Sequence, residues 1–200
     1  MLFTALLLSG CRLEIRDPQT FLTAYRKAAE TASTAGNYTM SSMLATPEYL
    51  AGARFRGESA PSKAVFDSLR QLYQGSLYLA FSVAPLSEGA SPGAHTDVVG
   101  EELSKGRSAF AEGLNMMQNG LSQLCYLELS DGSKVFPSTY SFDRGWGLRK
   151  DVNFLFAFPK TWNGKAVDPA KARFVIQDFG LNIGNIRHAI KSPPRMNLKV

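Results

Sequence analysis

The periodicity of apolar residues changes from helical to extended at Ser76. Before this residue, apolar side chains recur at helical spacing, as in the stripe that runs from Val65 to Tyr73. After it, short runs rich in aromatic and β-branched residues alternate with turns, and 77–83, which precedes Pro85, is the first of these runs. A chain with helical segments first and strands afterwards is typical of an α+β fold.

Helices are predicted mainly in the N-terminal half. Asp17 can cap a helix in which Pro18 takes the first position, and the following apolar residues keep helical spacing until Gly36, which can end the helix. Loose alternation of apolar residues predicts one strand in this half, and caps with helical spacing predict two further helices. These elements are a strand at 38–44, a short helix that begins at Thr46 and Pro47, and a helix at 65–73 that ends before Gly75.

The C-terminal half is predicted to consist of short strands separated by turns. Asp131-Gly132 is a strong hairpin signal, and Trp162-Asn163-Gly164 marks another turn. Short strands at this spacing favour two antiparallel sheets over one parallel sheet. The predicted strands after 77–83 lie at 121–129, 134–142, 152–158, 172–179 and 181–190.

We therefore predict an α+β fold, mainly an antiparallel β-sandwich that is immunoglobulin-like in type, with two to four helices mostly in the N-terminal half. Segment 103–117 is compatible with a further helix, although Gly106 and Gly113 weaken this interpretation. The length of 200 residues indicates one globular domain, which we place at 17–192. Residues 193–200 are expected to form a C-terminal tail or an edge segment.

The N-terminal residues predict export and lipid attachment. Residues 1–10 are uncharged and too short to span a bilayer, which takes about 20 residues, so we interpret them as the remnant of a signal peptide whose charged start lies upstream. Residues 8–11, Leu-Ser-Gly-Cys, resemble the lipobox of bacterial lipoproteins, in which the thiol of the cysteine, here Cys11, receives a diacylglycerol. Residues 11–16 are then a lipidated tether. Arg12 in place of an Asp after the cysteine favours the outer membrane.

The charge distribution argues against a nucleic-acid partner. The net charge is +5, but Lys and Arg are interleaved with acidic residues and never form a run of four, whereas nucleic-acid sites cluster their basic residues. Of the two cysteines, Cys125 lies in an apolar stretch. We expect it to be a buried free thiol that packs like a small hydrophobic residue.

No catalytic, metal or cofactor site is predicted. The two histidines, His95 and His188, lack the spacing of zinc ligands, and no Gly-x-Ser-x-Gly motif is present. Asp131 and Asp143 lie in predicted turns without the pattern of a calcium loop, which leaves a calcium ion between loops as an open alternative. We expect His188 to be a half-exposed strand residue rather than a general base.

Four segments carry a resemblance to a known group of proteins. They are Thr46–Leu50, Leu79–Pro85, Leu129–Pro137 and Phe154–Pro159. In this order they resemble uncharacterised bacterial lipoproteins, mainly from predatory and soil-dwelling Gram-negative bacteria. The Ser- and Gly-rich stretch 86–120 departs from that group. The resemblance implies an envelope location and a sandwich-like body, and it implies nothing about catalysis.

The turn-rich stretch 140–150 is predicted to be an interaction loop. It holds Phe142, Arg144 and Trp146, and aromatic and Arg side chains supply most of the binding energy at interfaces. The alternative is that Trp146 folds back over the core, since large aromatic side chains are usually buried.

The predicted function is that of a lipoprotein anchored to the bacterial cell envelope, which binds or scaffolds another envelope component, with another envelope protein as one candidate partner. No enzyme activity is predicted, because the sequence contains no clustered catalytic set. Two alternatives stay open: an envelope enzyme with a dispersed site, and a carbohydrate-binding sandwich with exposed aromatic side chains. A deep pocket with ionisable groups would favour the enzyme, and exposed aromatic residues would favour sugar binding.

Replacing Cys11 tests the predicted anchor. We expect the Cys11→Ser variant, expressed with its full natural leader, to lose membrane association, because acyl chains on the thiol supply the attachment. Partitioning between detergent and aqueous phases measures this loss against the unmodified chain. Unchanged partitioning of the variant into detergent would contradict the prediction.

Overall fold

The structure is a computed structural model that describes residues 13–56, 61–86, 98, 106–143 and 151–200. The N-terminal elements are β1 (Leu13–Ile15), α1 (Pro18–Ala29), β2 (Thr31–Ala35), β3 (Tyr38–Ala45), α2 (Pro47–Ala53) and α3 (Lys63–Leu72). They are followed by β4 (Ser76–Pro85), α5 (Arg107–Asn115), a π-helical turn (Met116–Gly120) and α6 (Leu121–Leu124). The remaining strands are β5 (Cys125–Glu128), β6 (Lys134–Val135), β7 (Thr139–Asp143), β8 (Val152–Pro159), β9 (Thr161–Trp162), β10 (Lys165–Ala166), β11 (Arg173–Ile176), β12 (Ile186–Ala189) and β13 (Met196–Leu198), with a 3-10 turn at Pro169–Lys171.

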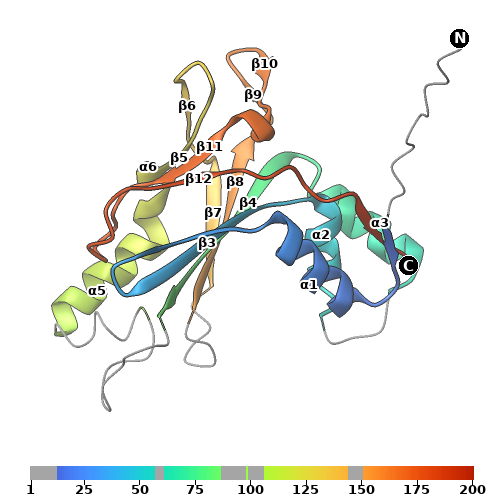
Figure 1. Ribbon diagram of the computed structural model, residues 1–200, viewed down its shortest axis with the longest axis horizontal. Helices are drawn as coiled ribbons and strands as arrows, with labels where there is room; N and C mark the ends of the chain where they lie inside the picture. Colours follow the sequence, from blue (N-terminus) through green and yellow to red (C-terminus); the bar gives the residue numbers. More distant parts are fainter. Residues whose placement is uncertain (1–12, 57–60, 87–97, 99–105, 144–150) are drawn as a thin grey trace, which may run out of the picture.

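Two antiparallel sheets form the body of the molecule (Figure 1). The larger sheet has the strand order β2-β3-β4-β8-β7, and the smaller has the order β12-β11-β5-β6. Every pair of neighbours in these two sheets is antiparallel. Outside them, β9 and β10 form a hairpin, and β1 and β13 form a parallel pair. The predicted α+β class with mainly antiparallel sheets is confirmed.

Most of the longer helices in the described residues lie in the N-terminal half of the chain. In the described residues, the helices of seven or more residues are α1, α2, α3 and α5, which agrees with the prediction. α5 settles the ambiguity of segment 103–117 in favour of a helix from Arg107 onwards. No helix in the described part of the chain is long and apolar enough to cross a membrane.

Side chains from the two sheets meet in the main hydrophobic core. Phe154, Phe156 and Phe158 alternate along β8, and each is at most 2% exposed. The ring of Phe174 in β11 lies 5.7 Å from that of Phe156 and 5.5 Å from that of Phe81 in β4, measured between ring centroids. Burying one such side chain stabilises the fold by about 1.5–3 kcal/mol. These contacts hold the inner face of the smaller sheet against the larger one.

A second core joins the N-terminal helices to the five-stranded sheet at one end of the molecule (Figure 1). Asp17 caps α1 as predicted, since its carboxylate accepts a hydrogen bond from the backbone N–H of Thr20 at 2.7 Å. Tyr25 in α1 is 1% exposed, and its hydroxyl donates to the carbonyl of Leu44 in β3 at 2.9 Å. A buried hydrogen bond therefore supplements the apolar contacts between helix and sheet.

The predicted extent of the first helix is wrong, because α1 ends at Ala29 rather than at Gly36. The segment Thr31–Ala35 forms the edge strand β2, which pairs with β3. Gly36 lies in the turn between these strands with a φ of +56°, a conformation that glycine adopts without strain. Pairing with β3 overrides the helical spacing of the alanines in this segment.

Several predicted strands are shorter in the structure. Segment 121–129 begins with α6 and becomes a strand only at Cys125. Segment 134–142 is divided into β6 and β7, and Pro137 between them has no N–H group to donate to a neighbouring strand. In segment 181–190 only β12 is a strand.

Both ends of the described chain belong to the folded body. β1 and β13 pair in parallel, with Ile15 opposite Leu198. Leu198 is 5% exposed and is part of the second core. Segment 193–200 is therefore an edge segment rather than a free tail, and the expected tether at 11–16 contains β1. Burial of Leu198, with Ile15 and Met196 packed beside it against the second core, accounts for the difference.

Truncating Phe174 tests the contact between the sheets. We expect Phe174→Ala to lower the free energy of unfolding by about 3–5 kcal/mol, because the ring fills space between two packed sheets. Urea unfolding measures the change. Phe136→Ala is the matched control, since the Phe136 side chain is 43% exposed. An equal loss in the two variants would contradict this role of Phe174.

Candidate ligand-binding site

Two β-hairpins project side by side from the same end of the molecule and form the candidate site (Figure 1). The first joins β5 to β6. Gly132 in its turn has a φ of +82°, and the backbone N–H of Ser133 donates to the carboxylate of Asp131 at 2.9 Å. The Asp-Gly pair thus forms a hairpin turn, as predicted.

The second hairpin joins β9 to β10 through Asn163 and Gly164. These residues have φ values of 50° and 74°, which is the backbone pattern of a two-residue type I′ turn. Trp162 lies directly opposite Lys165, so the two side chains share one face of the hairpin. Because the hairpin extends beyond the sheets, Trp162 remains 37% exposed.

The space between these hairpins, which we call the hairpin cleft, has a volume of about 470 Å³. Ligand sites in proteins typically have volumes of about 300–1,000 Å³. The cleft is lined by hydroxyl, carboxylate, amide and ammonium groups and by one large aromatic side chain. The residues that supply these groups are Ser130, Asp131, Trp162, Asn163, Lys165 and Lys171.

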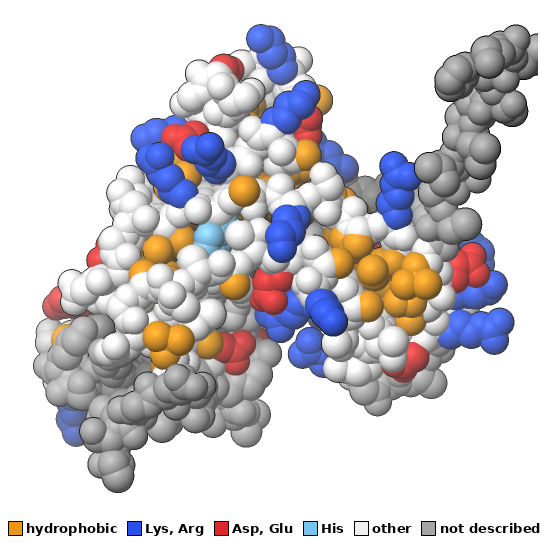
Figure 2. Space-filling model, in the orientation of Figure 1, with side chains coloured by type: hydrophobic (Ala, Val, Ile, Leu, Met, Phe, Trp, Pro, Cys, Tyr) orange, Lys and Arg blue, Asp and Glu red, His pale blue; other side chains and the backbone are white. Residues whose placement is uncertain are grey.

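The charges that line the hairpin cleft are balanced. Hydrogen bonds from the backbone and side chain of Ser133, assisted by the charge of Lys165, lower the pKa of the Asp131 carboxyl, which is therefore ionised at neutral pH. Asp168 accepts from the backbone N–H of Ala170 at 3.1 Å and lies 3.4 Å from the ammonium of Lys171. Figure 2 shows basic and acidic side chains close together at this end of the molecule. Two Lys and two Asp line the cleft, so it has no large excess of either sign.

The turn at Asn163-Gly164 was predicted from the sequence, but no role was predicted for Trp162. A signal was present, because a residue directly before a two-residue turn lies at the tip of its hairpin. At such a position a large ring can remain partly exposed, and Trp162 is 37% exposed, unlike most large aromatic side chains. The combination of a tryptophan and a tight turn therefore predicts an exposed ring.

The predicted interaction loop is only partly within the described residues. Phe142 lies in β7, where its ring stacks on that of Phe154 with 5.1 Å between centroids and 22° between planes. Its side chain is half-buried against the main core. Arg144 and Trp146 lie outside the described residues, as do Cys11 and His95.

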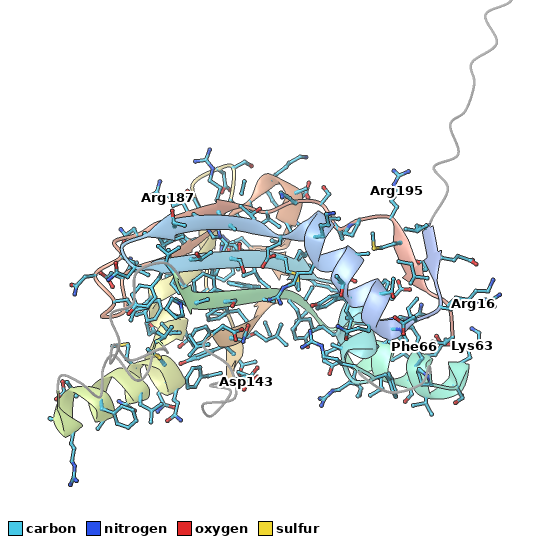
Figure 3. The ribbon with its side chains drawn as sticks, turned by 60° about the horizontal axis from the view of Figure 1, so that its bottom comes forward. Arg16, Lys63, Phe66, Asp143, Arg187 and Arg195 are labelled. Atoms are coloured by element: carbon cyan, nitrogen blue, oxygen red, sulfur yellow. The ribbon has the colours of Figure 1, made fainter. Side chains whose placement is uncertain are left out.

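The prediction that His188 is half-exposed is wrong, because the side chain is 2% exposed and lies on the inner face of β12. Nε2 is 2.7 Å from the hydroxyl of Ser33 in β2, and Nδ1 is 2.8 Å from the hydroxyl of Ser42 in β3. The neighbouring Arg187 lies at the outer surface, as alternation along a strand requires (Figure 3). Because hydroxyl groups occupy both ring nitrogens, no carboxylate orients His188 as in a catalytic triad.

His188 belongs to a polar seam between the edges of the two sheets. β2 and β12 are edge strands of the larger and the smaller sheet. The hydroxyl of Thr31 donates to the carbonyl of Ala189 at 2.9 Å, and the ammonium of Lys191 donates to the carbonyl of Glu30 at 2.5 Å. Together with the two serine contacts of His188, these bonds join the sheets along one side. We interpret His188 as a structural residue that helps to join the two sheets.

The other groups considered for chemistry are not arranged as reactive sites. Cys125 is fully buried, and burial raises the pKa of its thiol far above neutral pH, which keeps it protonated. In the described part of the chain, no group of three or more His, Cys, Asp or Glu side chains is close enough to hold a metal ion. Cys125 therefore has the environment of a packing residue.

A second cavity, of about 360 Å³, lies beside α3 at the other end of the molecule. Its charged side chains are occupied by ion pairs: Asp67 lies 3.2 Å from both Lys63 and Arg70, and Lys199 lies 2.8 Å from Glu14. Figure 3 shows Lys63 at this end, far from Arg187. The hairpin cleft differs because it offers an exposed aromatic ring.

Comparisons with known proteins do not identify the chain. No family model matches it, and no curated protein matches it. A crystal structure of a protein of unknown function from Burkholderia pseudomallei is similar over 87% of this chain and 83% of that chain, with 13% identity and a TM-score of 0.41. This likeness is too distant to support an inference about function.

The polar seam predicts a specific pH dependence of stability. Burial lowers the pKa of His188 below its ordinary value of 6.5, so the unfolded chain binds a proton more readily than the folded chain. The free energy of unfolding therefore falls as the pH decreases through 6.5 towards the folded-state pKa. Urea unfolding at several pH values measures this slope. His188→Gln, which cannot be protonated, is expected to show a smaller slope, and equal slopes would contradict the prediction.

Proposed function

We propose that this chain is a lipid-anchored protein of the bacterial cell envelope that binds an envelope component in the hairpin cleft. The observation that carries the proposal is the cleft itself, in which the exposed ring of Trp162 lies among polar groups from two hairpins. Large exposed aromatic side chains are enriched at binding sites, because burying them on contact with a ligand is favourable. The proposal does not require a catalytic step.

β1, which follows the proposed anchor in the sequence, lies away from the cleft. In the sequence only Arg12 separates Cys11 from Leu13, the first residue of β1, and two residues of extended chain reach about 7 Å. Lipid on Cys11 would therefore hold β1 close to the membrane. The two hairpins project from a different end of the molecule from β1, so the cleft remains accessible (Figure 1). We propose the outer membrane as the location on the basis of Arg12.

The two sheets are consistent with a β-sandwich, since Phe81 and Phe156 of one sheet contact Phe174 of the other. The immunoglobulin-like type stays a prediction. The enzyme alternative has the pair Ser33 and His188 as its nearest candidate, but the seam that holds them gives His188 no acidic partner. Carbohydrate binding is favoured by the exposed side chain of Trp162.

The proposed function is tested with the lipidated full chain in vesicles. Fluorescently labelled cell-wall and outer-membrane fragments from a Gram-negative bacterium are mixed with these vesicles, which are then floated on a density gradient. We expect the fragments to float with vesicles that carry the unmodified chain and to be lost with Trp162→Ala, which removes the exposed ring.

Phe136→Ala is the matched control, because Phe136 is an exposed aromatic residue that does not line the cleft. It is expected to retain binding of the fragments. Failure of the unmodified chain to bind any fragment, or equal binding by the Trp162→Ala variant, would overturn the proposal.

A further inference from the structure

We propose that the ligand of the hairpin cleft is a neutral carbohydrate, recognised by stacking of a sugar ring on Trp162 and by hydrogen bonds to its hydroxyl groups. This inference rests on the proposed function and specifies the chemical class of the ligand. Three properties of the cleft carry it: the partial exposure of the aromatic ring, the variety of hydrogen-bonding groups in the lining, and the balance of charge.

The ring of Trp162 is available for stacking. In the described part of the chain, no other aromatic ring packs against it, whereas the buried phenylalanines contact one another. The C–H face of a pyranose ring is apolar and flat enough to cover an indole ring, and covering it removes apolar surface from water. Trp162 thus offers a platform that the protein's own core does not use.

Hydrogen-bonding groups of opposite polarity border this platform. Lys165 lies on the same hairpin face as Trp162 and offers donors, and the ionised carboxylate of Asp131 on the other hairpin offers acceptors. Asn163 and Ser130 can act in both ways. Each sugar hydroxyl both donates and accepts, so a mixed set of this kind suits a ligand with many hydroxyl groups.

The charge of the lining argues against a polyanion. Lys171 is paired with Asp168 at 3.4 Å, and Asp131 and Lys165 both line the cleft. A uronate polymer or a nucleic acid would therefore meet one carboxylate for each ammonium group in the cleft. The cleft volume of about 470 Å³ lies in the range of small-molecule sites, about 300–1,000 Å³. Protein partners instead usually bury a broad surface of about 800 Å² on each side.

Tryptophan fluorescence gives a direct test, because the chain has two tryptophans and Trp146→Phe leaves Trp162 as the single reporter. This variant, as a full-length chain, is titrated with neutral tetrasaccharides of glucose and of N-acetylglucosamine and with a tetrasaccharide of galacturonate. We expect a saturable change in emission with a neutral sugar. The change should persist in about 1 M salt, where charges are screened beyond about 3 Å.

Calorimetry, with Trp146 kept in every variant, measures the contribution of the Trp162 ring to sugar binding. Trp162→Ala is expected to weaken binding of the neutral sugar at least about tenfold, which corresponds to about 1.4 kcal/mol. Phe136→Ala is expected to bind like the unmodified chain. Urea unfolding of each variant shows whether its fold is retained, and the fluorescence titration tests the cleft with Trp162 in place.

The outcomes separate this inference from the proposed function. Salt-sensitive binding of the galacturonate sugar without binding of a neutral sugar would overturn the inference. So would the absence of sugar binding by a chain that still binds envelope fragments through Trp162, and in that case the proposed function would stand. Absence of binding to both the sugars and the fragments would overturn both proposals.

Discussion

The five-stranded sheet buries side chains on both of its faces, and the other elements are arranged to cover them. Leu44 and Met43 are neighbours in β3, yet Leu44 belongs to the core shared with the smaller sheet and Met43 to the core shared with the helices. A sheet that is apolar on both sides needs a partner on each side. Because the smaller sheet and the helices fill these places, the two hairpins remain at the periphery, where they can bind a ligand.

The sequence predicted the elements whose residues agree with their tertiary setting. The cap at Asp17, the strand that becomes β4 and the hairpin at Gly132 follow from local chemistry, and the structure has all three. The end of α1 was not predictable from periodicity, because the alanines near Thr31 suit a helix and only pairing with β3 makes them extended. The contact between the sheets involves strands distant in sequence, so a pattern within one strand cannot specify it.

The candidate site was less predictable than the fold. The turn at Asn163 was recognisable. The cavity, however, also depends on the β5–β6 hairpin, which begins more than 30 residues earlier, at Cys125. Sequence spacing alone cannot show that these hairpins lie side by side. His188 illustrates the same limit, because its two hydroxyl partners come from the N-terminal strands β2 and β3. Alternation with Ile186 and Ile190 places His188 on the buried face of β12, but its hydroxyl partners depend on the meeting of two sheet edges, which no pattern around residue 188 indicates.

The parallel pairing of β1 with β13 has a mechanical consequence. The backbone N–H of Leu13 donates to Arg195, and that of Lys199 donates to Ile15, so the first strand is fastened to the last. A pulling force applied to the chain before Leu13 loads these bonds along the strand direction, and several of them must yield together. While the β1–β13 pairing holds, such a force cannot unravel α1 and the elements that follow it from the N-terminal end. The pairing of the C-terminal strand therefore contributes to the force that the chain withstands before it unravels from its N-terminus.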